Sequence, residues 1–579
     1  MQKSNYTPGT TLWVERQNQW LAMGIDVENM IKPKIAVVNT SGGAVNGCYG
    51  HLDELSRIVQ HAILDRGALP FEIKTKPLEN AVVSARMKRA HPMLSRDLLA
   101  REIQTTIEGA FLDGMVCISS DERDTPAHLI AAARSNVPTV ILACGYQAGA
   151  ACENDRFDDQ FFDIFNVYDE IGPLASGGVT REEYAYLPQA SVITTGACSG
   201  LSMANSMQLT AEALGMTLPG NSPIWAKGKR LRDFARRAGE TVVQLTLDNV
   251  LPRNILTAKA FENAVMVMLA AGGSIGTVRH LSAIAAATGL PIDVLSLFER
   301  FSRDINLLTA IRPNGIFRTE DFDGAGGTAA LMTRLSGYLN LDSMTVAQTT
   351  LGENIAGSRV NNDEIILPLK EPLSNRPSIG ILRGNLAPEG ALIRLAALPA
   401  GCERISGPAK VFTSEHSAVE AVQKGSVHKG DVLILRNMDP EGRDGEMFAF
   451  SLAAALHGCG LAEFVAVVTD GQLSALNRSI VAGLVMPDAA SGGPLAAVRD
   501  GDWIYLDFTN LRIQLDIPND EMDIRLREQQ ACRKPNAPVR TLELEMKPCW
   551  CQDMLDENYQ ESGHSIHGRM CERKGQLTF

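Results

Sequence analysis

Two cysteines stand in glycine-containing turns whose composition is typical of chemically active sites. Cys198 lies among small residues at 196–200, between a β-branched and apolar run at 190–195 and a helical pattern. A cysteine in a strand-to-helix turn lies near backbone N–H groups and a positive helix end, which favours the thiolate that binds metal or attacks carbon. An isolated cysteine of this kind is more often a small packing residue. A second cysteine, Cys48, in a comparable turn at 46–52 shifts the interpretation toward a site.

Acidic residues follow a predicted strand at 114–118. They are Asp121, Glu122 and Asp124, just before a predicted helix that begins near residue 127. Carboxylates at a strand end are plausible ligands for a divalent cation. They also suit a helix N-terminus, where negative charge is favourable and Asp124 or Thr125 would act as the cap. The helix-terminus interpretation is the simpler of the two, and the residue types alone leave both open.

The elements that would position these residues alternate along the first part of the chain. Short apolar runs predict buried strands, and apolar stripes with helical spacing predict helices between them. Such alternation predicts an α/β domain with a largely parallel sheet, whose strand ends carry the ligand-binding loops. The predicted strands are 34–39, 114–118, 139–144 and 190–195, and the predicted helices include 52–66, 95–110 and most of 203–310.

The second part of the chain has a different character. After a polar, proline-containing stretch at 361–377, strand-like runs separated by glycine and aspartate turns predict a β-rich, barrel-like domain. These runs are 432–435, 464–468, 503–508 and 513–517. We therefore expect an N-terminal α/β domain over 1–365, a barrel-like domain over 378–530 and a divergent tail over 531–579.

The tail carries cysteines and histidines that could ligate zinc, although their spacing differs from the usual paired arrangement. A flexible tail is the simpler interpretation. The residues concerned are Cys549, Cys551, His564, His567 and Cys571.

Composition excludes several classes of protein. The net charge of −13 argues against a general nucleic-acid binder. The 11 scattered cysteines do not form a disulfide framework and favour a reducing compartment. No apolar run reaches the ~18 residues that a membrane span needs. The first 19 residues carry no apolar signal core, so we expect a cytoplasmic protein without membrane or nucleic-acid partners.

The motifs, taken together, resemble the family that includes dihydroxy-acid dehydratase, phosphogluconate dehydratase and the sugar-acid dehydratases. The resemblance runs from about residue 34 to 530, with many matches in the same order. They are Asn-Gly-Cys-Tyr-Gly-His-Leu at 46–52, Thr-Gly-Ala-Cys-Ser-Gly at 195–200, Met-Ala-Asn-Ser-Met at 203–207, Glu-Ala-Leu-Gly-Met at 212–216, Phe-Glu-Asn-Ala at 261–264, Arg-Gly-Asn-Leu-Ala-Pro-Glu-Gly at 383–390, Gly-Pro-Ala at 407–409 and Thr-Asp-Gly at 469–471.

This resemblance implies a hydro-lyase and a homodimer with active sites between domains. The implied reaction removes water from a small 2,3-dihydroxy or sugar-type carboxylic acid and gives a 2-keto acid. An iron–sulfur cluster held by three cysteines would leave one iron open as a Lewis acid for the departing hydroxyl. A neighbouring Mg²⁺ would hold the substrate carboxylate, and a serine alkoxide would remove the C2 proton.

The implied site residues match this chain only in part. Cys48 and Cys198 match two cluster ligands, and Ser474 matches the base. The third cluster cysteine falls on Asp121, the Mg²⁺-binding aspartate on Glu122, and the carbamylated lysine on Arg123. A carboxylate is a harder ligand for iron than a thiolate, and an arginine cannot be carbamylated.

Three hypotheses follow from this pattern. The first is a divergent dehydratase that acts on a hydroxylated acid. The second is a catalytically impaired pseudoenzyme of the same fold, which serves as a binding or partner protein, because the changes concentrate on metal ligands. The third is new chemistry with carboxylates binding one divalent metal and no cluster. Fold resemblance alone does not decide between them.

Overall fold

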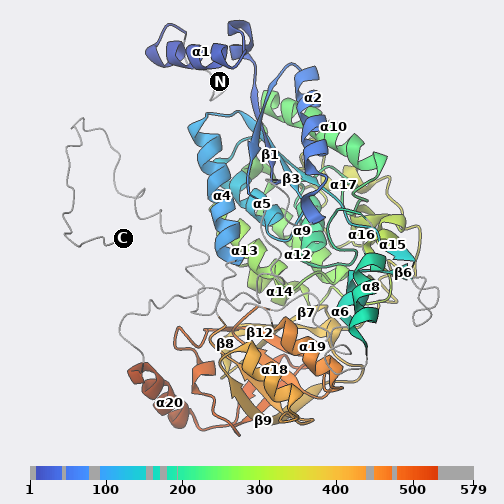
Figure 1. Ribbon diagram of the computed structural model, residues 1–579, viewed down its shortest axis with the longest axis vertical. Coiled ribbons are helices and arrows are strands. Elements are labelled where there is room, and N and C mark those ends of the chain that lie inside the picture. Colours follow the sequence, from blue (N-terminus) through green and yellow to red (C-terminus); the bar gives the residue numbers. More distant parts are fainter. Residues whose placement is uncertain are drawn as a thin grey trace, which may run out of the picture.

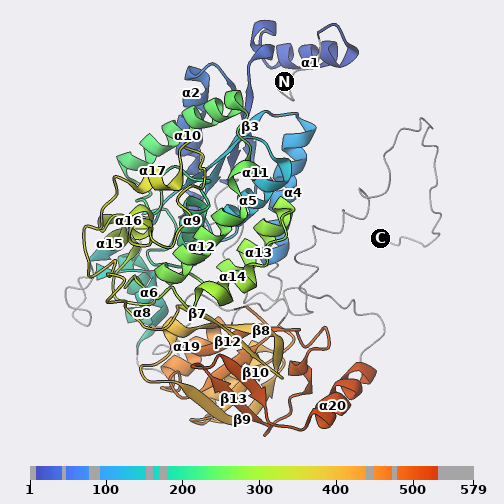
Figure 2. The ribbon, with the colours of Figure 1, turned by 180° about the vertical axis from the view of Figure 1, so that it is seen from behind.

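The chain forms an α/β part and a β-barrel, stacked along the long axis of the molecule (Figure 1). The computed structural model describes residues 8–41, 47–76, 92–151, 161–169, 179–191, 194–438, 449–472 and 479–532. Helix α1 (Thr11–Ala22) stands at the far end from the barrel, as both views show (Figures 1 and 2).

A four-stranded parallel sheet forms the centre of the α/β part, in the order β2-β1-β3-β4. The strands are β1 (Lys34–Asn39), β2 (Leu69–Lys74), β3 (Gly114–Ser119) and β4 (Thr139–Ala143). β1, β3 and β4 are buried along their whole length, which explains their continuous apolar sequences. The expected α/β fold with a parallel sheet is confirmed.

Two pairs of helices accompany the sheet. α2 (Leu52–Asp65) packs beside α10 (Lys229–Asp248), and α4 (Pro92–Gly109) packs beside α5 (Asp124–Ser135). The remaining elements of this part include α6 (Ile164–Asp169), α8 (Arg181–Ser191), α9 (Met203–Ala213), α11 (Pro252–Ile255), α12 (Ala258–Ala271), α13 (Thr277–Thr288), α14 (Val294–Phe301), α15 (Thr319–Gly324), α16 (Gly327–Arg334), α17 (Leu351–Ile355) and the short strands β5 (Ala150–Ala151) and β6 (Phe161–Phe162).

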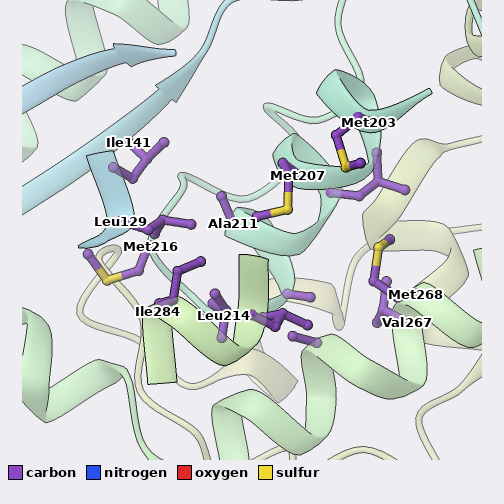
Figure 3. Packing of buried hydrophobic residues seen from close by; sticks show 14 of the residues in the cluster. Leu129, Ile141, Met203, Met207, Ala211, Leu214, Met216, Val267, Met268 and Ile284 are labelled. Carbon is purple, nitrogen blue, oxygen red and sulfur yellow. The ribbon is translucent and has the colours of Figure 1, made fainter. Parts of the chain in front are cut away.

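Helix α9 runs through the core, and every one of its residues is buried. Figure 3 shows Met203 and Met207 of this helix among side chains from β4, α5, α12 and α13. Burial of an apolar side chain of this size stabilises the fold by about 1.5–3 kcal/mol relative to its exposure. The core therefore fixes α9, and with it the turn that precedes the helix.

The C-terminal part is a closed barrel of eight strands, in the order β10-β11-β12-β8-β7-β14-β13-β9. The expected barrel-like second part is confirmed. Its strands are β7 (Ile379–Gly384), β8 (Ala387–Arg394), β9 (Arg404–Phe412), β10 (Val432–Leu435), β11 (Ala466–Thr469), β12 (Ile480–Met486), β13 (Trp503–Asp507) and β14 (Arg512–Leu515), with helices α18 (Glu415–Gln423), α19 (Phe450–Gly458) and α20 (Asn519–Cys532) around them.

Specific contacts join the two parts. Arg394 of β8 donates from Nη2 to Asn314 Oδ1 at 2.6 Å, and Ser378 donates to the Leu269 carbonyl at 2.8 Å. The barrel is thereby held against α12 and against the segment between α14 and α15. The boundaries 1–365 and 378–530 stay predictions, and the predicted tail at 531–579 lies outside the described residues from 533 onward.

One predicted strand is wrong. The β-branched run at 190–195 predicts a strand, but α8 extends to Ser191, and Thr194–Thr195 is irregular. Glu182 and Glu183 in the first turn of α8 favour a helix, and tertiary packing decides such short ambiguous runs. Among the described residues, no helix combines the length and the apolar composition that a membrane crossing requires.

Candidate active site

The candidate site lies at the carboxyl edge of the parallel sheet. β1, β3 and β4 run in one direction and in register, with Asn39 opposite Ile118 and Ser119 opposite Ala143. The segments that follow these strands must therefore meet at one edge. They carry Cys48 after β1, Asp121 after β3 and Gly145 after β4.

Hydrogen bonds fasten the loop after β3 to the Cys48 turn. Ser120 donates from Oγ to the Cys48 carbonyl at 2.5 Å, and Tyr49 donates from its hydroxyl to Asp121 Oδ2 at 3.3 Å. Gln208 of α9 donates from Nε2 to the Ser120 carbonyl at 3.0 Å. The loop is thus held from two sides, by the cysteine turn and by a core helix.

The Cys198 turn is held by backbone contacts and not by a preceding strand. The Ala197 amide donates to the Gly145 carbonyl at 2.8 Å, and the Gln147 amide donates to the Ala197 carbonyl at 2.7 Å. Gly196 has φ of 134°, and a Cβ there would lie 2.7 Å from the Gln147 nitrogen. Only glycine suits this backbone conformation and this close approach. The turn therefore rests on the segment after β4.

The three predicted cluster ligands come together at this edge. Burial first, and then the Asp121 carboxylate, raise the pKa of both thiols: Cys48 well above its usual value and Cys198 to about 12. Cys198 also acts on Cys48, so the thiols and the carboxylate lie within electrostatic reach of one another.

The expectation that the turn lowers the pKa of the Cys198 thiol is wrong for the polypeptide alone. The thiol is buried beside a carboxylate, and both effects disfavour the thiolate. Neither cysteine is paired in a disulfide, and each residue keeps some exposed surface although its thiol is buried.

The predicted Mg²⁺ ligand, Glu122, has a buried arginine as its neighbour in the structure. The Glu122 side chain, 20% exposed, lies beside the Arg123 guanidinium, which is 4% exposed; Arg123 Nε and Glu122 Oε1 are 3.8 Å apart. A helix is present as predicted, with the acidic Asp124 in its first turn, but it begins before residue 127, and Arg123 is its N-cap, so the prediction of Asp124 or Thr125 as cap is wrong. Asp124 is instead the first helical residue, and its carboxylate accepts the Ser120 amide at 2.9 Å.

The residues at the site fit the implied iron–sulfur cluster better than the implied Mg²⁺. Two thiols and a carboxylate converge, so Cys48, Cys198 and Asp121 fit an iron–sulfur cluster with one oxygen ligand, although both Asp121 oxygens already accept hydrogen bonds. Mg²⁺ does not fit, because the fixed guanidinium charge of Arg123 lies beside Glu122, the predicted Mg²⁺ ligand. Within the described ranges, no three His, Cys, Asp or Glu side chains are arranged to hold a single metal ion.

The predicted base, Ser474, lies outside the described residues. The segment before it is anchored in the barrel: the Asp470 carboxylate accepts the backbone amides of Asn437, Met438 and Ala489 at 2.9–3.0 Å. Burial raises the pKa of Asp470 to about 6. The barrel thus fixes the start of the segment that carries Ser474, and the role of that serine stays a prediction.

Arg96 and Arg279, two buried basic residues near Arg123, have no role in the predictions from sequence. Arg96 is 1% exposed and donates from Nη1 to His280 Nδ1 at 3.2 Å. The sequence does contain a sign of this burial. Arg96 lies on the same face of α4 as Leu99, Ile103 and Ile107, which are all buried. An arginine on an apolar stripe indicates a buried charge with a specific partner.

The comparisons with known proteins agree with this architecture. Two profiles of one family match the chain: "Dihydroxy-acid/6-phosphogluconate dehydratase N-terminal" over residues 32–354 and the corresponding C-terminal profile over residues 364–548. The chain is 37% identical over 508 residues to a dihydroxy-acid dehydratase of Caldicellulosiruptor saccharolyticus, covering 87% of this chain and 91% of that protein. It is 36% identical over 513 residues to one of Acetivibrio thermocellus, covering 88% of this chain and 91% of that protein, and 34% identical over 508 residues to one of Methanococcoides burtonii, covering 87% and 91%.

The α/β part followed by a closed barrel, together with this similarity, places the chain among proteins of the dehydratase type. The chain belongs to the dihydroxy-acid/6-phosphogluconate dehydratase family.

Proposed function

We propose that this protein is a dehydratase that removes water from a small 2,3-dihydroxy or sugar-type carboxylic acid and releases a 2-keto acid. The convergence of Cys48, Cys198 and Asp121 at the carboxyl edge of the sheet carries the proposal. Family membership supports the same class of reaction. A homodimer in the cytoplasm, as the resemblance implies, belongs to the same proposal.

The reaction needs a base for the C2 proton and assistance for the C3 hydroxyl. Loss of that proton and that hydroxyl yields an enol and one water molecule, and the enol tautomerises to the 2-keto acid. Ser474 is the proposed base. Cys48, Cys198 and Asp121 would hold an iron–sulfur cluster, which supplies a Lewis-acidic iron for the departing hydroxyl when bound.

The residues around these ligands would orient them. The Tyr49 hydroxyl donates to Asp121 and restricts its carboxylate, while the Ser120 hydroxyl restricts the Cys48 turn. Burial around both thiols excludes bulk water from most of the site. No step is assigned to Mg²⁺, because Arg123 stands where its lysine ligand would be.

The test is a measurement of iron and acid-labile sulfide per chain after purification without oxygen, with 2-keto acid formation assayed on a panel of dihydroxy and sugar acids. We expect iron, sulfide and turnover in the wild-type protein and their loss in Cys198→Ser. Cys402→Ser is the matched control, because Cys402 is a partly accessible free thiol near the start of β9. A folded protein without iron and without turnover would contradict the proposal and favour the non-catalytic alternative.

A further inference from the structure

Arg123 is a buried cation, and only some of its N–H groups make hydrogen bonds. Its side chain is 4% exposed, and Nη1 donates to Ser95 Oγ at 3.2 Å. Its Nε and Nη2 atoms are buried and have no hydrogen-bond partner among the described residues. Buried guanidinium N–H groups without partners are costly, so a group that satisfies them is expected.

The two unsatisfied atoms lie on the same edge of the guanidinium. Nε–H and one N–H of Nη2 point in parallel, which is the arrangement that receives the two oxygens of a carboxylate. The Glu122 carboxylate does not fill this edge, because its Oε1 is 3.8 Å from Nε, beyond hydrogen-bond length. Glu122 is 20% exposed and Cys48 is partly exposed, so the buried guanidinium lies next to residues that solvent reaches.

The surroundings of Arg123 carry further positive charge. Arg96, Arg279 and Arg123 are each less than 9% exposed, and all three act on His280. Burial first, and then these guanidiniums, hold the pKa of His280 well below its usual value, so the imidazole is neutral. Arg96 pairs with Asp97 at 2.8 Å, whereas the ion pair of Arg123 among the described residues is the 3.8 Å contact with Glu122. Asp121 and Asp124 also lie near, since they act together with Arg123 on Tyr49, but neither carboxylate is hydrogen-bonded to Nε or Nη2 of Arg123. These two donors are therefore still unsatisfied and suit an anionic oxygen pair.

We infer that Arg123 is the carboxylate receptor of the site, and that its Nε–H and Nη2–H groups bind the acid group of the substrate directly. The protein would then recognise its substrate without a divalent cation. This deepens the proposed function and rests on it for the class of substrate. The arginine that removes the Mg²⁺ site would itself supply the positive charge.

The inference is tested by calorimetric titration of the full-length protein, after dialysis against EDTA, with 2,3-dihydroxypropanoate. Its neutral amide and inorganic phosphate serve as comparison ligands, and each titration is repeated with added Mg²⁺. We expect the acid to bind, the amide to fail, and Mg²⁺ to leave the affinity unchanged. Arg123→Gln should weaken acid binding about tenfold or more, since it removes two charge-assisted hydrogen bonds.

Two further variants keep the test decisive. Arg123→Lys retains the charge without the two-pronged geometry and should fall between the wild type and Arg123→Gln, which guards against a folding defect in the latter. Arg253→Gln is the matched control, because Arg253 donates from Nε to the Ala133 carbonyl at the other end of α5, at 2.9 Å. It should bind the acid as the wild type does.

Several results would overturn the inference: no binding of the acid, binding that requires Mg²⁺, equal binding of acid and amide, or a wild-type affinity in Arg123→Gln. Tighter binding of phosphate than of the acid would also overturn it, because the receptor would then suit a tetrahedral anion. Turnover is measured separately. A protein that forms 2-keto acid but binds the acid only with Mg²⁺ would retain the proposed function and lose this inference.

Discussion

The Cys198 turn and the loop after β3 meet at the carboxyl edge of the sheet, and they differ in how many of the family's site residues they retain. The Cys198 turn keeps the family's cysteine and a glycine at φ of 134° that permits close contact with the segment after β4. The loop after β3 carries Asp121, Glu122 and Arg123 where the resemblance implies cysteine, aspartate and lysine. Yet its backbone is fastened as firmly, through Ser120 to Cys48 and through Gln208 to Ser120.

The comparison separates the position of a turn from its chemistry. Backbone contacts, core helix α9 and the hydrogen bonds of Ser120 and Gln208 fix where both turns lie, and of the three substituted side chains only Asp121 adds to them, through Tyr49. The charge of the site depends almost entirely on the three side chains. Substitutions of these three side chains should therefore change metal and anion binding, whereas substitution of Gly196 in the Cys198 turn should change stability.

The largest expected effect comes from restoring the family's side chains with Asp121→Cys, Glu122→Asp and Arg123→Lys together. Iron and sulfide content should rise, because thiolate is a better iron ligand than carboxylate and the lysine charge can be neutralised by carbamylation. A change of at least about tenfold in cluster affinity is expected, since even outer-shell changes alter metal affinity by that factor. Metal-free acid binding should be weaker in the same variant than in the wild type, because lysine lacks the two-pronged geometry of arginine.

The double variant Glu122→Asp with Arg123→Lys is the control for the restored thiol. It should show the weakened metal-free acid binding without gaining much iron. If the triple variant contains no more iron than the wild type, then Asp121 is not what limits the cluster, and the two turns differ less in chemistry than their sequences indicate.

A smaller effect is expected from Gly196→Ala in the other turn. The new Cβ would lie 2.7 Å from the Gln147 nitrogen and 2.9 Å from the Ala226 Cβ, at φ of 134°. Backbone strain of this kind costs about 1–3 kcal/mol, so thermal unfolding should begin at a lower temperature. Gly289→Ala is the control: its φ is 77°, but no atom lies within 4 Å of the place that its Cβ would take, so only the conformational cost applies. Equal losses in both variants would mean that the contact with the segment after β4 does not hold the Cys198 turn.

How far sequence predicts this molecule depends on how each strand is buried. The apolar runs predict β1, β3, β4 and β10 within one residue of their ends, because strands buried on both faces have continuous apolar sequences. Edge strand β2 is not predicted: it is only partly buried and contains Pro70 and Glu72. Such a sequence carries too weak a pattern to predict a strand.

The barrel strands β7, β8, β9 and β12 escape prediction for another reason, since each contains glycine or proline, which predicts turns. The structure explains two of these glycines by close approach. A Cβ at Gly407 would overlap the Gly430 carbonyl oxygen, and one at Gly384 would overlap the Ile513 carbonyl oxygen. Neighbouring backbone, distant in sequence, requires these glycines, and no local pattern reveals that.

The candidate site also has features that sequence predicts and features that only tertiary packing determines. Parallel strands must end at one edge, so the proximity of the Cys48 turn and the loop with Asp121 follows from the order of the elements. Burial of Arg123 does not, because it depends on α4 and Ser95 packing over the start of α5. The roles of Cys48, Asp121, Cys198 and Glu122 as ligands, and of Ser474 as base, stay predictions.

The smallest expected effect tests the link between the two cysteine-bearing regions. Ser120→Ala removes the hydrogen bond of 2.5 Å to the Cys48 carbonyl, while the Gln208 contact to the Ser120 carbonyl remains. A stability loss of about 1 kcal/mol is expected. The Cys48 turn should loosen, so alkylation of the Cys48 thiol by iodoacetamide, followed by mass spectrometry, should become faster while the Cys198 rate stays the same. Ser282→Ala is the control, because that hydroxyl bonds only within its own helix, to the Val278 carbonyl at 2.9 Å. If both thiols accelerate together, the two turns move as one unit, and the separation of position from chemistry at this edge fails.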